Sequence, residues 1–206
     1  MGPRAVAGAR ALAGWLLGAV ACALAGCVTP PPRAGHVPAA TANATNDAGA
    51  APATLPLLAP ASLGQTRQFT QLLRGDYGDT SFSLRCVVSI DDRQLSVIGL
   101  TALGQRAFTL KYDGAQLDEE RAPQLPQAIG GVQLLNDLQL VYWPLPALQK
   151  AWQTAGGEVS EPYPGTRRLK RGGRLVAEVH YAADAWSGRV WLRHFDTPYS
   201  LFIETE

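Results

Sequence analysis

Alternating apolar and polar residues are the feature that most constrains how this chain can fold. The pattern is clearest between residues 80 and 90, where Phe82, Leu84 and Val88 lie among mainly polar neighbours. A period of two places one set of side chains on one face of a strand. Similar runs lie at 67–74, 94–100, 106–112, 116–120, 167–170, 174–181, 188–195 and 199–203. The sequence therefore predicts antiparallel strands joined by tight turns, with Asp113-Gly114 a strong hairpin signal.

One segment with a different period interrupts these strands. Residues 132–143 are apolar at eight of twelve positions, so they predict a helix that is buried on more than one side. The polar exceptions are Gln133, Asn136, Asp137 and Gln139. A proline at 144 ends this helix, and a second short helix is expected at 146–152. Strands, then two helices, then strands predict an α+β domain with one antiparallel sheet and helices against one face.

The amino-terminal segment has the pattern of a lipoprotein signal peptide. Arg4 and Arg10 precede a short apolar run, and Leu24-Ala25-Gly26 leads directly into Cys27. The run is shorter than the roughly 20 residues that span a bilayer. We expect residues 1–26 to be removed and Cys27 to be lipidated, which would anchor the chain to a membrane. An uncleaved anchor or a secretory signal with a chance cysteine is the alternative.

Residue 28 is valine rather than the aspartate that retains many lipoproteins in the inner membrane. We therefore expect the outer membrane, with the domain facing the periplasm, while the inner membrane stays open. Residues 28–62 contain seven of the fifteen prolines and eleven alanines. Such a composition buries too little apolar surface to order itself, so 27–62 is predicted to be a lipidated, disordered linker and 63–206 the folded domain.

Charge and cysteine content exclude several classes of partner and site. Without the signal peptide, 16 basic and 17 acidic residues remain, which is no footprint for nucleic acid. Cys86 would be the single thiol apart from Cys27, so no intramolecular disulfide is expected. Because Cys86 falls on the apolar face of its strand, we expect it to be buried and inert.

Catalytic patterns are sparse. The histidines are His36 in the linker and His180 and His194 on expected strands, and their spacing does not suggest a metal site. The sequence has neither a nucleophile elbow nor a phosphate-binding glycine loop. We therefore predict a protein that is not an enzyme and needs no metal or cofactor.

Two segments carry a family resemblance. Residues 99–105 (GLTALGQ) and 135–144 (LNDLQLVYWP) resemble signatures of an uncharacterised family of bacterial lipoproteins, whose genes are often found in aryl-polyene and related fatty-acid synthesis clusters. That family is in turn similar to the LolA/LolB group, which carries lipoproteins through the periplasm. The resemblance implies a curved sheet, an open half-barrel, with helices covering a concave apolar face. It also places Leu103-Gly104 at the hairpin where LolB has a membrane-contacting leucine.

The resemblance leads to a functional hypothesis with one alternative. We expect an outer-membrane lipoprotein that binds or transfers an acylated hydrophobic molecule, such as a lipid, a lipoprotein or an aryl-polyene lipid. Its partners would be the membrane through Cys27, the acyl ligand and a periplasmic carrier protein. A non-catalytic scaffold with a packed core is the alternative, because periodicity does not distinguish a core from a cavity. The candidate cavity residues are Phe82, Leu84, Val88, Leu95, Val97, Phe108, Leu110, Leu138, Val141, Trp143 and Trp152.

Overall fold

One ten-stranded antiparallel sheet forms the framework of the domain. The structure, a computed structural model, describes residues 55–123 and 130–206. The sheet order is β5-β4-β3-β2-β1-β10-β9-β8-β7-β6. The strands are β1 (Arg67–Tyr77), β2 (Thr80–Ile90), β3 (Leu95–Leu100), β4 (Arg106–Tyr112), β5 (Leu117–Arg121), β6 (Gly157–Tyr163), β7 (Thr166–Arg171), β8 (Arg174–Tyr181), β9 (Gly188–His194) and β10 (Tyr199–Thr205).

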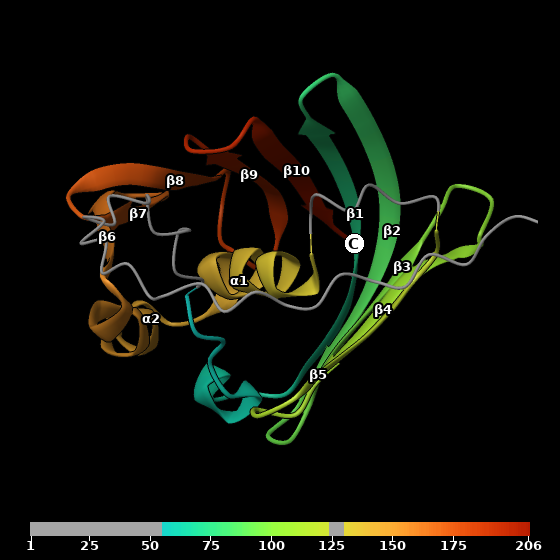
Figure 1. Cartoon of the computed structure of the whole chain (residues 1–206), viewed down its shortest axis with the longest axis horizontal. Coiled ribbons are helices and arrows are strands. Elements are labelled where there is room, and N and C mark those ends of the chain that lie inside the picture. The colour runs from blue at the N-terminus through green and yellow to red at the C-terminus, as the bar shows by residue number, and fades with distance from the viewer. Residues whose placement is uncertain (1–54, 124–129) are drawn as a thin grey trace, which may run out of the picture. The chain divides into compact units, whose positions relative to one another are not determined.

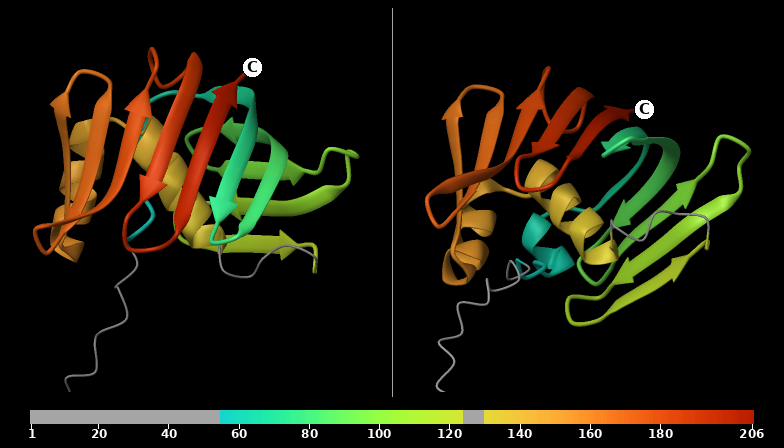
Figure 2. Two further views of the ribbon diagram at one scale, coloured as in Figure 1. Left: turned by 90° about the horizontal axis from the view of Figure 1, so that it is seen from above. Right: turned by 45° about the horizontal axis from the view of Figure 1, so that its top comes forward.

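The chain path explains where the helices lie. Strands β1 to β5 run as a meander from the middle of the sheet to one edge, and β6 to β10 return from the opposite edge. The first and last strands, β1 and β10, pair at the centre. The connection between the edges contains α1 (Gly131–Tyr142) and α2 (Leu145–Trp152). Figures 1 and 2 show the sheet curving around α1 without closing, so the predicted α+β open half-barrel is confirmed.

Two glycine–phenylalanine pairs fill the inner face where neighbouring strands meet. Gly75 on β1 lies opposite Phe82 on β2, and Gly99 on β3 lies opposite Phe108 on β4. A Cβ on Gly75 would be 2.1 Å from the Phe82 ring, and one on Gly99 would be 2.4 Å from the Phe108 ring. Each ring therefore occupies the space that a side chain on its partner would need, which requires glycine at both positions.

The predicted elements agree well with the observed ones. Strands β2, β4 and β8 have the expected bounds, and α1 begins and ends within one residue of 132–143. Strand β2 buries Leu84, Cys86, Val88 and Ile90, as the alternation indicates. The expectation that Cys86 is buried is confirmed, and burial raises the pKa of its thiol to about 12.

Two segments differ from the prediction. Strand β6 (Gly157–Tyr163) was not expected, because it is an edge strand that buries only Gly157 and Val159 and contains a proline. Residues 55–62 were assigned to the linker, but Leu55 and Leu58 are buried in the core. The core therefore includes residues that precede residue 63, since these leucines contact residues some eighty positions later.

Some predictions fall on residues that the structure does not describe. The signal peptide, Cys27 and the linker as far as residue 54 lie outside the described residues. In the part of the chain that is described, no helix combines the length and the apolar character that crossing a bilayer requires.

Candidate functional site

The eleven predicted cavity residues lie together on the concave side of the sheet, but they fill it. Ten are buried, and Phe82 is half-buried against the same core. A void of about 30 Å³ lies beneath α1 and is lined in part by Val97, Phe108 and Leu138. This space holds one or two water molecules and is far too small for an acyl chain. In this conformation α1 therefore sits directly on the apolar face of the sheet.

Two tryptophans fill much of the remaining interior. Trp143 and Trp152 are the largest fully buried side chains among the described residues. The indole N–H of Trp143 donates to Ser62 Oγ at 2.8 Å, and that of Trp152 donates to Pro56 O at 2.9 Å. Both indole rings therefore hydrogen-bond the helices to the segment that precedes β1, and these bonds stabilise the position of residues 55–62.

Helix α1 carries polar side chains on its buried surface. The amide of Gln139 makes a two-point contact with Leu58: Leu58 N donates to Gln139 Oε1 at 2.9 Å, and Gln139 Nε2 donates to Leu58 O at 2.8 Å. Asn136 Nδ2 donates to Leu55 O at 3.2 Å. Asn136 Oδ1 and Asp137 Oδ2 are buried without a hydrogen-bond partner. Both side chains border a small cavity, so the buried surface of α1 is held by polar contacts as well as by apolar packing.

An ion pair joins α1 to strand β9. His194 Nε2 lies 2.9 Å from Asp137 Oδ1, and the His194 ring stacks on Tyr199 with 5.3 Å between centroids. Burial lowers the pKa of His194, but the hydrogen bond and charge of Asp137 and the charge of Asp196 outweigh it, so the net pKa is raised. A small cavity of about 140 Å³ adjoins this pair and is also lined by Asn136.

The carboxyl end of α1 is held by a buried arginine. Arg167 on β7 donates through Nη1 to Leu140 O at 2.7 Å and to Trp143 O at 2.9 Å, and it pairs with Glu161 at 2.7 Å. These carbonyls belong to the last turn and cap of the helix, which has no intrahelical donors for them. Tyr181 adds a hydrogen bond from its hydroxyl to Val141 O at 2.7 Å. In the sequence Arg167 belongs to the basic cluster Arg167-Arg168 and Lys170-Arg171, which is typical of an exposed strand edge, whereas the structure buries Arg167.

The hairpin between β3 and β4 presents an exposed leucine. Leu103 is 86% exposed, whereas most large apolar residues of the described chain are buried. Gly104 adopts a left-handed φ of 75°, and its N–H donates to Thr101 O at 2.9 Å. Gln105 N also donates to Thr101 Oγ1 at 3.2 Å. These hydrogen bonds fix a tight turn, and the Leu103 side chain at its tip is exposed to solvent.

The two histidines of the described ranges lie apart from each other, each beside an acidic side chain. His180 lies 2.7 Å from Glu178 on the outer face of the sheet, and His194 lies under α1 on the inner face. Within residues 55–123 and 130–206, no group of three His, Cys, Asp or Glu side chains could hold a metal ion.

Comparison with known proteins identifies a family but not an activity. No curated protein matches the chain. A solved structure of a DUF1329 family protein from Desulfovibrio piger is similar with a TM-score of 0.31 and 7% identity, over 69% of this chain and 84% of that chain. A family model described as "Protein of unknown function (DUF3261)" matches residues 68–206. Since this match spans most of the sequence, the chain belongs to the DUF3261 family.

Proposed function

We propose that this protein binds an acylated hydrophobic molecule on the concave face of its half-barrel and transfers it at the outer membrane. The observation that carries the proposal is α1, an apolar helix that covers the inner face but is held there in part by the polar side chains Asn136, Asp137 and Gln139. Because water can replace these hydrogen bonds when the helix moves, displacing it costs less than displacing a helix that is packed by apolar side chains alone. Helix α1 then acts as a lid over the acyl site.

The energy of acyl burial is large enough to open such a lid. A buried methylene contributes about 0.8 kcal/mol, so a chain of about twelve gives roughly 10 kcal/mol. Opening would break the contacts of Gln139, Asn136 and Asp137 described above, and those of Arg167 wherever the carboxyl end of the helix moves, each a hydrogen bond of about 1 kcal/mol or more. It would also expose apolar surface that the acyl chain then covers, so the broken polar contacts and the cost of association limit the net affinity.

Leu103 would contact the membrane during transfer. Its position on a short, hydrogen-bonded turn lets an apolar side chain enter a bilayer surface without unfolding the sheet. Lipidation of Cys27 would keep the domain close to that surface. Within this proposal the half-barrel is LolA/LolB-like, and the ligand is a lipid, a lipoprotein or an aryl-polyene lipid.

Fluorescent fatty-acid binding followed by delivery to liposomes tests the proposal. The full chain should take up the probe, and Gln139→Ala should take it up faster because α1 is less firmly held. Leu103→Glu should bind the probe normally but deliver it at least several-fold more slowly, whereas the matched variant Leu103→Met should deliver it normally. If wild type and Gln139→Ala both fail to bind at micromolar protein, the proposal is wrong.

A scaffold with a packed core is the second candidate function. The filled interior, in which Trp143 and Trp152 are fully buried, favours it. Crosslinking in cells distinguishes the two: protein adducts without lipid adducts support the scaffold, and lipid adducts on concave-face residues support the carrier.

A further inference from the structure

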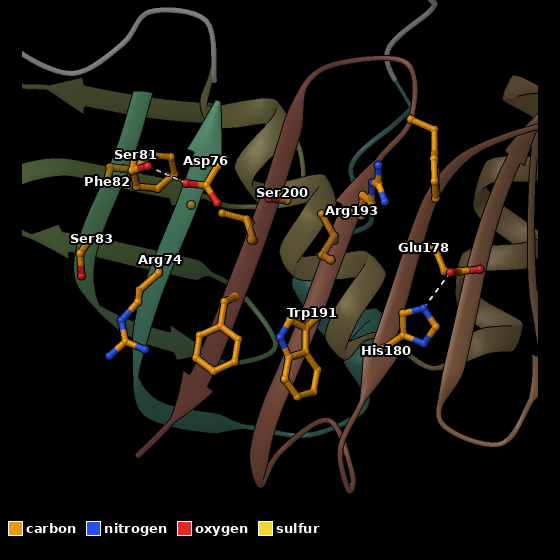
Figure 3. A pocket seen from close by; sticks show the side chains of 15 residues that line it. Arg74, Asp76, Ser81, Phe82, Ser83, Glu178, His180, Trp191, Arg193 and Ser200 are labelled. Atoms are coloured by element: carbon orange, nitrogen blue, oxygen red, sulfur yellow. Dashed lines mark hydrogen bonds and ion pairs between the residues drawn. The ribbon is translucent and has the colours of Figure 1, made fainter. Parts of the chain in front are cut away.

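The outer face of the sheet, away from α1, contains a groove much larger than either space beneath the helix. Its volume is about 1060 Å³, and it crosses β2, β1, β10, β9 and β8. Figure 3 shows Arg74, Trp191 and His180 projecting from these strands on one side of the sheet. The groove lies where the first and last strands pair, so residues from both ends of the domain form it.

Strand register arranges the groove in two rows. Ser83, Arg74, Phe202, Trp191 and His180 are direct cross-strand neighbours in the first row. Ser81, Asp76, Ser200, Arg193 and Glu178 form the second row, two residues further along each strand. The first row therefore gives an aromatic floor with a cation at its side, and the second gives hydroxyls and charges.

The aromatic floor is open to solvent. Trp191 is 44% exposed, and its ring lies 5.4 Å from that of Phe202 between centroids. Phe195, at the end of β9, is 46% exposed. Exposed aromatic rings on the polar face of a sheet have no role in the core, and they offer flat apolar surfaces to a ligand.

Two arginines of the groove, Arg74 and Arg193, have no acidic side chain paired with them in the described part of the chain. Arg74 lies over the Phe202 ring at 5.6 Å and Arg193 over Phe195 at 5.2 Å. In the described part of the chain neither forms an ion pair, whereas Arg168 on the same face pairs with Glu178. His180 also contacts Glu178, at 2.7 Å. The Glu178 carboxylate is thus occupied. Asp76 accepts a hydrogen bond from Ser81 Oγ at 2.6 Å and keeps its negative charge, so among the described residues the groove has two guanidiniums and one carboxylate outside ion pairs.

The separation of the two free arginines indicates an extended ligand. Strands are about 4.8 Å apart and rise about 3.3 Å per residue, so the Arg74 and Arg193 Cα atoms lie about 12 Å apart. The Arg74 guanidinium lies over the Phe202 ring and the Arg193 guanidinium over the Phe195 ring, so a ligand that contacts both in these positions has to extend along the groove. A single guanidinium can bind one carboxylate in a bidentate geometry, so each arginine can hold one acidic group of such a ligand.

We propose that the outer groove is a binding site for an acidic oligosaccharide, with sugar rings stacked on Trp191 and Phe202 and carboxylates paired with Arg74 and Arg193. The serine hydroxyls of both rows would bond sugar hydroxyls. A bilayer surface fits less well, because the groove is hollowed and a flat surface would not reach its floor. The site is separate from the concave face, so it does not depend on the carrier function.

Calorimetric titration of the full chain in mild detergent with a galacturonic acid hexamer tests the proposal. The acidic hexamer should bind and should change the fluorescence of the half-exposed Trp191, while a neutral glucose hexamer should bind at least tenfold more weakly. Trp191→Ala and Arg74→Gln should each weaken binding at least tenfold. Arg189→Gln is the matched control, since Arg189 lies on the same face but pairs with Glu204. It should bind like wild type.

Three results would overturn the proposal: equal binding of the neutral and acidic hexamers, unchanged binding by folded Trp191→Ala and Arg74→Gln, or no binding at millimolar hexamer. Binding to vesicles of phosphatidylglycerol that requires Arg74 and Trp191, without hexamer binding, would assign the face to a membrane instead. Leu103→Glu should leave hexamer binding intact, so failure of the carrier function and failure of this site are distinguishable.

Discussion

Replacing Arg167 with methionine should destabilise the domain strongly. The change preserves most of the side-chain volume but removes the donors that reach Leu140 O and Trp143 O at the end of α1. A hydrogen bond to a charged group is worth about 1.5–3 kcal/mol, so losing two predicts a loss of roughly 3–6 kcal/mol. Arg167 also donates a longer bond to Val141 O, at 3.4 Å. Its loss should add little to the destabilisation, because the Tyr181 hydroxyl still donates to Val141 O.

Urea unfolding followed by circular dichroism measures this loss. The free energy of unfolding of a domain of this size is about 5–15 kcal/mol. Arg167→Met should therefore lower the urea concentration at the unfolding midpoint substantially and the melting temperature by roughly 10 °C. Glu161→Gln is the control: Glu161 has 42% of its side chain exposed, so its pair with Arg167 should be worth at most about 1 kcal/mol. A change below about 1 kcal/mol in Arg167→Met would refute the claim that Arg167 holds the end of α1.

Three further predictions concern the inner face. Gly99→Ala should destabilise by about 1–3 kcal/mol in urea unfolding, because its Cβ would overlap the buried Phe108 ring. Gly130→Ala has open space around it and should lose only the preference of the α1 N-cap for glycine over alanine, about 1 kcal/mol or less. The folded pKa of His194 is raised, so the stability lost in His194→Asn should be largest below about pH 6.5 and should shrink as pH rises through that folded pKa. A difference that stays constant between pH 5.5 and 9 would contradict this. Cys86 should react with iodoacetamide at neutral pH far more slowly in the folded domain than in urea, and comparable rates would show that its strand opens readily.

The strands were predictable because their signal is local. Alternation over 80–90 and a hairpin turn at Asp113-Gly114 depend on neighbouring residues, and both match the structure. Strand β6 was missed because an edge strand buries little and needs no alternation. Leu55 and Leu58 were missed because their partners, Asn136 and Gln139, lie 81 residues away.

The candidate site was predictable only in part. Apolar patterning identified the residues of the concave face, but the volume left between them depends on how α1 and Trp143 pack, which periodicity does not encode. The outer groove was not predicted, because its two rows depend on the pairing register of five strands, β2, β1, β10, β9 and β8. Its one local signal is aromatic residues, Trp191 and Phe195, alternating with the buried positions of β9.

Mass spectrometry of non-covalently bound lipid tests the carrier account most directly. The full chain would be purified from its native membrane in mild detergent, and organic extraction would separate bound lipid from any acyl chains attached covalently to Cys27. The account predicts close to one acylated molecule per chain, and less from Leu138→Trp, which narrows the space beneath α1. Extracts that contain only the lipids of the surrounding membrane, in equal amounts for both proteins, would contradict it.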